Sequence, residues 1–161
     1  MLSSLHPYSF IKREDNEFSG YEFTTDSGVV YKAYFLDMST YAPHFESVYT
    51  FNFESDSPTS GYDSRVADTI CTILERLFAD NKNAVIVIYD STDDRERGRN
   101  RLFQQWYRCL GEISIEKIDR HCATPDYDIY SSLLIHQENP KRMLIIESFE
   151  RLVVNALTPI D

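Results

Sequence analysis

Residues 84–111 read AVIVIYDSTDDRERGRNRLFQQWYRCLG, and they hold the clearest strand and helix signals in the chain. The apolar run Ala84–Tyr89 has the length and the β-branched content of a strand buried on both faces. Ser91 can cap a helix, and apolar residues then recur at helical spacing up to Gly111, which can end that helix. Asp90 therefore lies where a buried strand meets a helix N-terminus, which is where open α/β sheets place ligands. This pattern predicts the place of a site but no reaction.

Around this unit the sequence predicts one domain, residues 1–161, with a core at 20–157 and an N-terminal arm at 1–17 that packs through Tyr8 and Phe10. The predicted fold class is α/β, with an α+β mixed sheet: a three-stranded antiparallel start is followed by the order α-β-α-β-β-α. The start of the last helix, Met143–Glu147, also fits a strand, but the spacing of later apolar residues favours a helix. The expected elements are a hairpin at Gly20–Leu36, a strand at Ser47–Glu54, a helix at Asp63–Ala79, strands at Glu112–Ile118 and Tyr127–His136, and a helix at Met143–Leu157.

The chain is acidic, with a formal net charge of −10, which argues against a nucleic-acid partner because phosphate binding needs a basic surface. Residues 1–80 carry 5 basic and 13 acidic side chains, so this half suits a protein partner with a basic surface. Three cysteines without close pairing predict reduced thiols in a cytoplasmic protein. No apolar run has the length of a membrane span, so no membrane association is expected.

Aromatic residues are concentrated in the first part of the chain, where 13 of the 22 precede residue 55. They could form a stacking platform for bases or sugars. An aromatic sheet face covered by helices explains them more simply, because the same segment is acidic. The sequence therefore favours a core role.

The first turns of the central helix contain the only dense basic cluster: Arg95, Arg97, Arg99 and Arg101. Guanidinium groups at this spacing can clamp a phosphate or a carboxylate. The neighbouring carboxylates can also form ion pairs with these guanidinium groups, and this internal pairing is the favoured interpretation. Both interpretations use the same residues, so the sequence leaves the choice open.

Asp90, Asp93 and Asp94 could hold a hard cation such as Mg²⁺ through oxygen ligands. The last two also suit the positive first turn of a helix, which explains them without a metal. Cys109 and the pair His121-Cys122 match no zinc spacing, and the thiols are expected in the core. The sequence contains no GxSxG elbow and no glycine-rich phosphate loop, so it carries no hydrolase or nucleotide-binding motif.

Three motifs, DSRVADTI at Asp63–Ile70, IYDSTDD at Ile88–Asp94 and RLFQQW at Arg101–Trp106, resemble an uncharacterised bacterial family, a domain of unknown function. This resemblance covers most of the chain. It implies no activity.

The predicted order of elements also resembles the core of GNAT acetyltransferases, and Asn100, Tyr107 and Gly111 are similar to that family's asparagine, aromatic and glycine run. This resemblance implies acetyl-CoA as a cofactor, with Asn100 and Tyr107 near the thioester and the arginines on its phosphates. The family holds the pyrophosphate with a basic, glycine-rich loop, whereas this chain has the acidic SPTSGYD at Ser57–Asp63. The fold is therefore expected to carry over and the activity is not.

A third, local resemblance joins VIYD, DDRERGR and the helix ending in CLG to the small ferredoxin-like subunit of CRISPR adaptation complexes. It implies a metal-dependent nuclease in which Asp90 binds the metal. About 80 residues precede this strand, whereas that family begins at it. The leading expectation remains a non-catalytic interaction or regulatory module without a cofactor, and an acetyltransferase or a nuclease are its alternatives.

Overall fold

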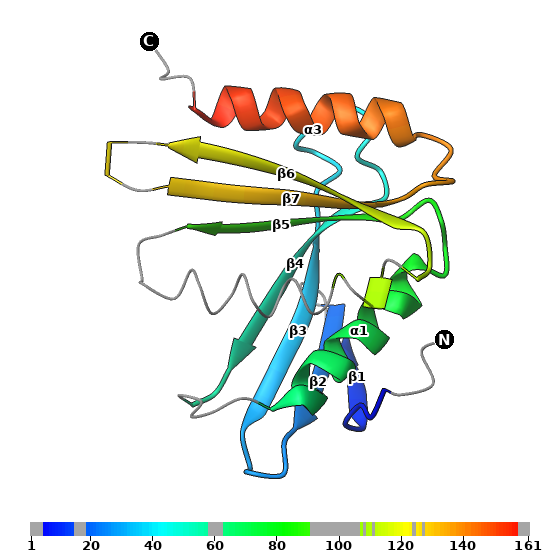
Figure 1. The fold of residues 1–161 in the computed structure, drawn as a ribbon, viewed down its shortest axis with the longest axis vertical. Coiled ribbons are helices and arrows are strands. Elements are labelled where there is room, and N and C mark those ends of the chain that lie inside the picture. The colour runs from blue at the N-terminus through cyan, green and yellow to red at the C-terminus, as the bar shows by residue number, and fades with distance from the viewer. Residues whose placement is uncertain are drawn as a thin grey trace.

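The computed structural model describes residues 5–14, 19–57, 63–90, 107, 109–110, 112–123, 125–126 and 128–157, without the side chains of 89, 90 and 155–157. They form a seven-stranded sheet and two long helices (Figure 1). The elements are β1 Phe10–Glu14, β2 Ser19–Thr24, β3 Val30–Asp37, β4 Val48–Ser55, α1 Ser64–Phe78, β5 Ala84–Asp90, β6 Ile115–Ala123, β7 Asp128–His136 and α3 Arg142–Leu157.

The strands lie in the order β1-β2-β3-β4-β5-β7-β6, and neighbouring strands are antiparallel except for β4 and β5. These two strands are parallel and are joined through α1, as expected for a crossover connection. This mixed sheet with a GNAT-like topology confirms the predicted fold class. The helix predicted after Asp90 lies largely outside the described residues, of which Tyr107, Cys109 and Leu110 are helical.

The expected N-terminal arm contains a strand, so four antiparallel strands open the sheet instead of three. Phe10 lies opposite Phe23 and packs edge-on against Tyr21, with 5.4 Å between ring centroids. This edge strand could not be predicted from the sequence, because Ile11, which follows Phe10, is apolar but 61% exposed and interrupts the alternation of apolar and polar residues. Tyr8 packs into the core, as expected.

β5 is buried on both faces only at its start. The prediction that all of Ala84–Tyr89 is buried on both faces is therefore wrong for the second half of the strand. Ala84, Val85 and Ile86 are at most 1% exposed, whereas Ile88 is 57% exposed. β4 pairs with β5 over three residue pairs and then diverges from it, as Figure 1 shows. The second half of β5 therefore has a strand neighbour on one side only among the described residues.

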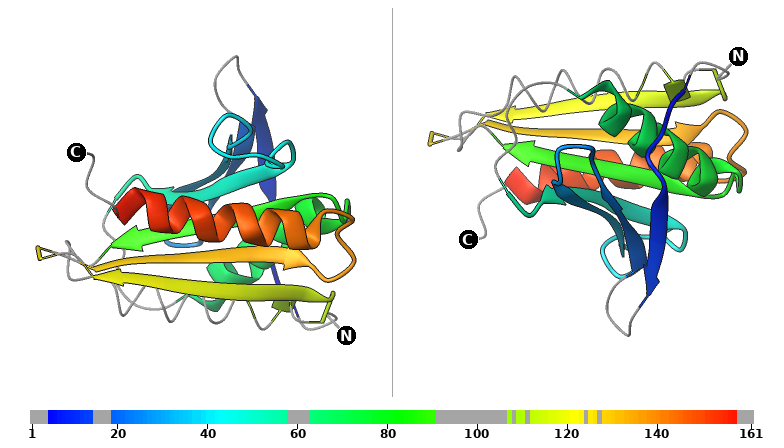
Figure 2. Two further views of the ribbon diagram at one scale, coloured as in Figure 1. Left: turned by 90° about the horizontal axis from the view of Figure 1, so that it is seen from above. Right: turned by 90° about the horizontal axis from the view of Figure 1, so that it is seen from below.

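The sheet carries a separate apolar core on each face. Successive residues of β5 point to opposite cores. Val85 belongs to the core that packs against α1, whereas Ala84 and Ile86 belong to the core that contains α3 residues such as Phe149. Figure 2 shows α1 and α3 on opposite sides of the sheet. This arrangement follows from the strand period of two, because alternate side chains of one strand pack against helices on opposite faces of the sheet.

Local signals explain the ends of several elements. Gly28 has a φ of +87° in the turn between β2 and β3, a backbone conformation that glycine adopts without strain. Met143–Glu147 is helical, which resolves that ambiguity in favour of α3. None of the helices in the described part of the chain is long and apolar enough to cross a membrane.

Candidate functional site

Most of the residues predicted as a site lie outside the described part of the chain, so their arrangement stays a prediction. They are Arg95, Arg97, Arg99, Arg101, Asn100, Asp93 and Asp94. Asp90 ends β5, but its side chain is outside the description too. Tyr107 packs partly buried against the core on the α1 side, with the Lys117 ammonium 5.9 Å from its ring centroid.

The residues considered as zinc ligands lie in different surroundings. Cys109 contacts Cys71 in the core on the α1 side, where burial raises the pKa of both thiols. His121 lies on the surface, 3.2 Å from an Asp128 oxygen and stacked on Tyr130. Over the described ranges, no three His, Cys, Asp or Glu side chains are placed to hold a metal ion.

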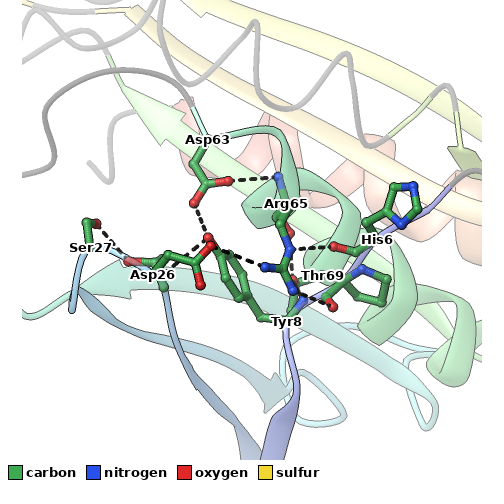
Figure 3. Close-up of polar contacts among 9 residues, drawn as sticks. His6, Tyr8, Asp26, Ser27, Asp63, Arg65 and Thr69 are labelled. Carbon is green, nitrogen blue, oxygen red and sulfur yellow. Dashed lines mark hydrogen bonds and ion pairs between the residues drawn. The ribbon is translucent and has the colours of Figure 1, made fainter.

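The N-terminus of α1 is capped by a side chain of the same chain, Asp63 (Figure 3). Asp63 caps the helix: its Oδ1 accepts from the backbone N–H of Arg65 at 2.9 Å, and its Oδ2 accepts from the Tyr8 hydroxyl at 2.5 Å. Burial, and then the hydrogen bond to Asp63, raise the pKa of Tyr8, so this phenol stays a neutral donor. A carboxylate of the chain therefore occupies the positive end of this helix, the position at which helix N-termini can bind anions such as phosphate.

Arg65 holds the segment before β1 against this helix end, as Figure 3 shows. Its guanidinium lies over the Tyr8 ring, 3.9 Å from the centroid, and donates to the carbonyl oxygens of His6 and Pro7 at 2.9 and 3.3 Å. Thr69 accepts from the backbone N–H of Tyr8 at 2.8 Å. These contacts join the N-terminal segment to α1, and we assign them a structural role.

A groove of about 580 Å³ lies on the α1 side of β1–β4, and we call it the aromatic groove. Its floor includes Tyr21, Phe35 and Tyr49, which share the sheet face of the core residues Phe23 and Phe51. The C-terminal part of α1 forms its wall. α1 has 15 residues and so is about 22 Å long, and its residues Ile73, Arg76 and Leu77 line the groove.

Charged residues lie at the two ends of the aromatic groove. Lys12 and Glu14 of β1 form an ion pair of 3.0 Å, which raises the pKa of Lys12, and the guanidinium of Arg76 lies 4.7 Å above the Phe10 ring centroid. At the opposite end, Asp37 and Asp80 flank Tyr49.

The pKa of Tyr49 is raised, mainly by burial and additionally by the nearby charges of Asp37 and Asp80. The phenol therefore stays protonated at neutral pH and can donate a hydrogen bond. The aromatic groove thus combines an apolar floor, a hydroxyl donor and two carboxylates, which together suit a ligand with a positive charge.

The sequence predicted the aromatic face but not the groove in it. Alternation places Tyr21, Phe35 and Tyr49 on one face together with the core aromatics, and no local signal separates the two groups. The difference comes from where α1 crosses the sheet. The expected aromatic core is therefore correct for residues such as Phe23 and Tyr31, which stack 5.3 Å apart, and incomplete for the groove.

Comparison with known proteins supplies a family. The model of a family of unknown function (DUF6169) matches residues 62–151. No curated protein matches the chain. Among solved structures, that of AAC(6')-Ib in complex with ribostamycin and coenzyme A is similar, with 12% identity over 78% of this chain and 68% of that chain and a TM-score of 0.43. The topology described above rests on the strand pairings of this chain.

Proposed function

Since the chain belongs to DUF6169, a family of unknown function, we propose from its own geometry that it is a non-catalytic interaction module whose aromatic groove recognises a protein partner. The aromatic groove carries this proposal. Its volume of about 580 Å³ falls in the range of recognition pockets, and its tyrosines and arginine are residue types that dominate binding energy at interfaces. The acidic first half of the chain supports a partner with a basic surface.

Binding of a purified partner to two matched variants tests this proposal. A partner is first isolated with the chain as bait, and its Kd is then measured with the purified chain. Tyr49→Ala removes an aromatic side chain from the groove, and we expect at least about a tenfold weaker Kd. Tyr34→Ala, on the opposite face of neighbouring β3, is the control and should leave Kd unchanged. Equal binding by both variants and the original chain overturns the proposal.

An acetyl-CoA-dependent acetyltransferase is the second candidate, supported by the GNAT-like topology and by the divergence of β4 and β5. The cap at α1 opposes it. The Asp63 carboxylate already accepts a helix N–H, and its charge would repel a pyrophosphate at the same place. A calorimetric titration with acetyl-CoA decides between the candidates. We expect no binding at about 1 mM, a weak limit that corresponds to about 4 kcal/mol. Binding followed by acetyl transfer would replace the interaction module with the enzyme.

A further inference from the structure

We infer that the aromatic groove, in the role proposed above, takes a lysine or arginine side chain from an extended segment of the protein partner. This side chain enters at the end formed by Asp37, Tyr49 and Asp80. The inference rests on the proposed function and names the chemistry that the partner must carry. It concerns the end of the sheet where β4 and β5 are paired, since Tyr49 lies opposite Val85.

The two carboxylates are held in place and keep capacity to bind. Asp37 lies directly opposite Tyr49 across β3 and β4, and its Oδ1 accepts from the backbone N–H of Ser39 at 2.7 Å. Asp80 follows α1, and its Oδ1 accepts from the backbone N–H of Lys82 at 3.0 Å. Each carboxylate therefore uses one oxygen locally. No cation pairs with the other oxygen within the part of the chain that the structure describes.

The floor of the aromatic groove can bind the apolar stem of a lysine or arginine side chain. Lysine and arginine have apolar stems that pack on aromatic rings, and their charged heads are attracted to ring faces within about 6 Å. Tyr21, Phe35 and Tyr49 supply these rings, and the Tyr49 hydroxyl remains a donor for a backbone carbonyl of the segment. A neutral apolar ligand would leave both carboxylates unused. The aromatic groove is therefore more complementary to a cation than to a hydrophobic peptide.

The opposite end gives the bound segment a direction. Arg76 lies above Phe10 of β1, and no carboxylate of the described residues is within ion-pair distance of it. Phe10 is in register with Ser55 of β4, so it lies three strand spacings, about 14 Å, across the sheet from Tyr49 and six residues, about 20 Å, along the strands from it. The two ends are therefore about 24 Å apart, which an extended chain crosses in about seven residues. A partner segment with a basic residue at the Asp37 end and an acidic residue about seven positions away would match both ends.

A designed peptide tests the inference whether or not a natural partner has been isolated. The probe is a fluorescent, capped glycine-serine peptide with one lysine and, about seven positions along, one glutamate. Two controls replace the lysine by norleucine or the glutamate by glutamine. We expect saturable binding that weakens at least about tenfold with norleucine, and a smaller loss with glutamine. Absence of binding at about 1 mM, or equal binding of the norleucine peptide, overturns the inference.

A double variant locates the binding to the acidic end. Asp37→Asn with Asp80→Asn keeps the local backbone hydrogen bonds and removes both charges, and both side chains belong to exposed residues, so the fold is retained. We expect at least about a tenfold loss of peptide affinity, while Asp126→Asn, an exposed control, changes nothing.

The natural partner separates the inference from the proposed function. If Tyr49→Ala abolishes partner binding and the Asp37→Asn, Asp80→Asn variant does not, the interaction module stands and the cationic ligand is wrong. If neither variant affects the partner, both are wrong. Loss of binding in both variants supports both.

Discussion

Asp63 shows what a single residue contributes to this fold. Its carboxylate caps α1 and receives the Tyr8 hydroxyl, so it links the helix to the segment before β1. We predict that Asp63→Ala lowers the free energy of unfolding by about 1 to 2 kcal/mol, because an N-cap and a charge-assisted hydrogen bond are both lost. Urea denaturation measures this change. Asp126→Ala, at an exposed position, is the control, and an equal loss there would contradict the prediction.

Glu75 is a residue whose charge opposes folding. Its Oε1 is buried and has no hydrogen-bond partner among the described residues, and burial, followed by the charge of Glu112, raises its pKa. The folded chain therefore holds a proton that the unfolded chain releases, so the free energy of unfolding falls as pH rises from 4.5 through the folded pKa. We predict that Glu75→Gln stabilises the protein by about 1 kcal/mol at neutral pH, because a buried unpaired charge is removed.

The pH dependence of Tm distinguishes this effect from a general one. The gain from Glu75→Gln should shrink as pH falls below 4.5, where the carboxyl is protonated in both states. Glu138→Gln, at an exposed position, should change Tm at neither pH. A gain from Glu75→Gln that is the same at pH 7 and pH 4 would show that charge is not its cause.

At the scale of elements, an ion pair joins α3 to β6. The guanidinium of Arg142 donates to both carboxylate oxygens of Glu116, at 2.5 and 2.8 Å, and the two side chains are each 30% exposed. This contact lowers the pKa of Glu116. Because the lowered pKa belongs to the folded state, the stabilisation is present above 4.5, the ordinary pKa, and is lost as pH falls through the folded pKa.

We predict that Glu116→Gln lowers the free energy of unfolding by about 1 kcal/mol at pH 7, because the pair is bidentate and partly buried, and that the loss is smaller at pH 3, below the ordinary pKa. Glu147→Gln is a matched control, since its partner Arg151 lies on the same helix and both side chains are more than half exposed. Denaturation at the two pH values measures both variants. Equal losses for the two variants would mean that burial of the Glu116 pair does not matter.

At the scale of the whole molecule, the net charge of −10 opposes the compact state through self-repulsion, most strongly in the first half of the chain. Salt screens this repulsion within about 10 Å at 0.1 M. We therefore predict that KCl raises Tm between low and physiological ionic strength. Glycerol serves as an uncharged control at the same osmolarity. A Tm that falls with KCl would show that attractive ion pairs outweigh the net charge.

The sheet also separates the two candidate regions along β4. The aromatic groove lies near the start of this strand, at Tyr49, where β4 still pairs with β5. The divergence of the two strands lies beyond Thr50, toward the end that leads to Asp63 and α1. A partner in the aromatic groove and a cofactor at the divergence would therefore occupy different places, so their binding can be measured independently on the same protein.

Local sequence patterns are sufficient to predict the fold class and most elements, because alternation and helical spacing report which side of each element is buried. The sequence predicted the order of the described elements from β2 to α3 and a helix that begins at Asp63, the residue that caps α1. It missed β1, since an edge strand with an exposed Ile11 lacks a local pattern. It could not find the aromatic groove, whose floor has the same alternation as the core. The set of aromatic residues that α1 covers and the point at which β4 diverges from β5 could not be predicted, because both depend on packing between residues far apart in the chain.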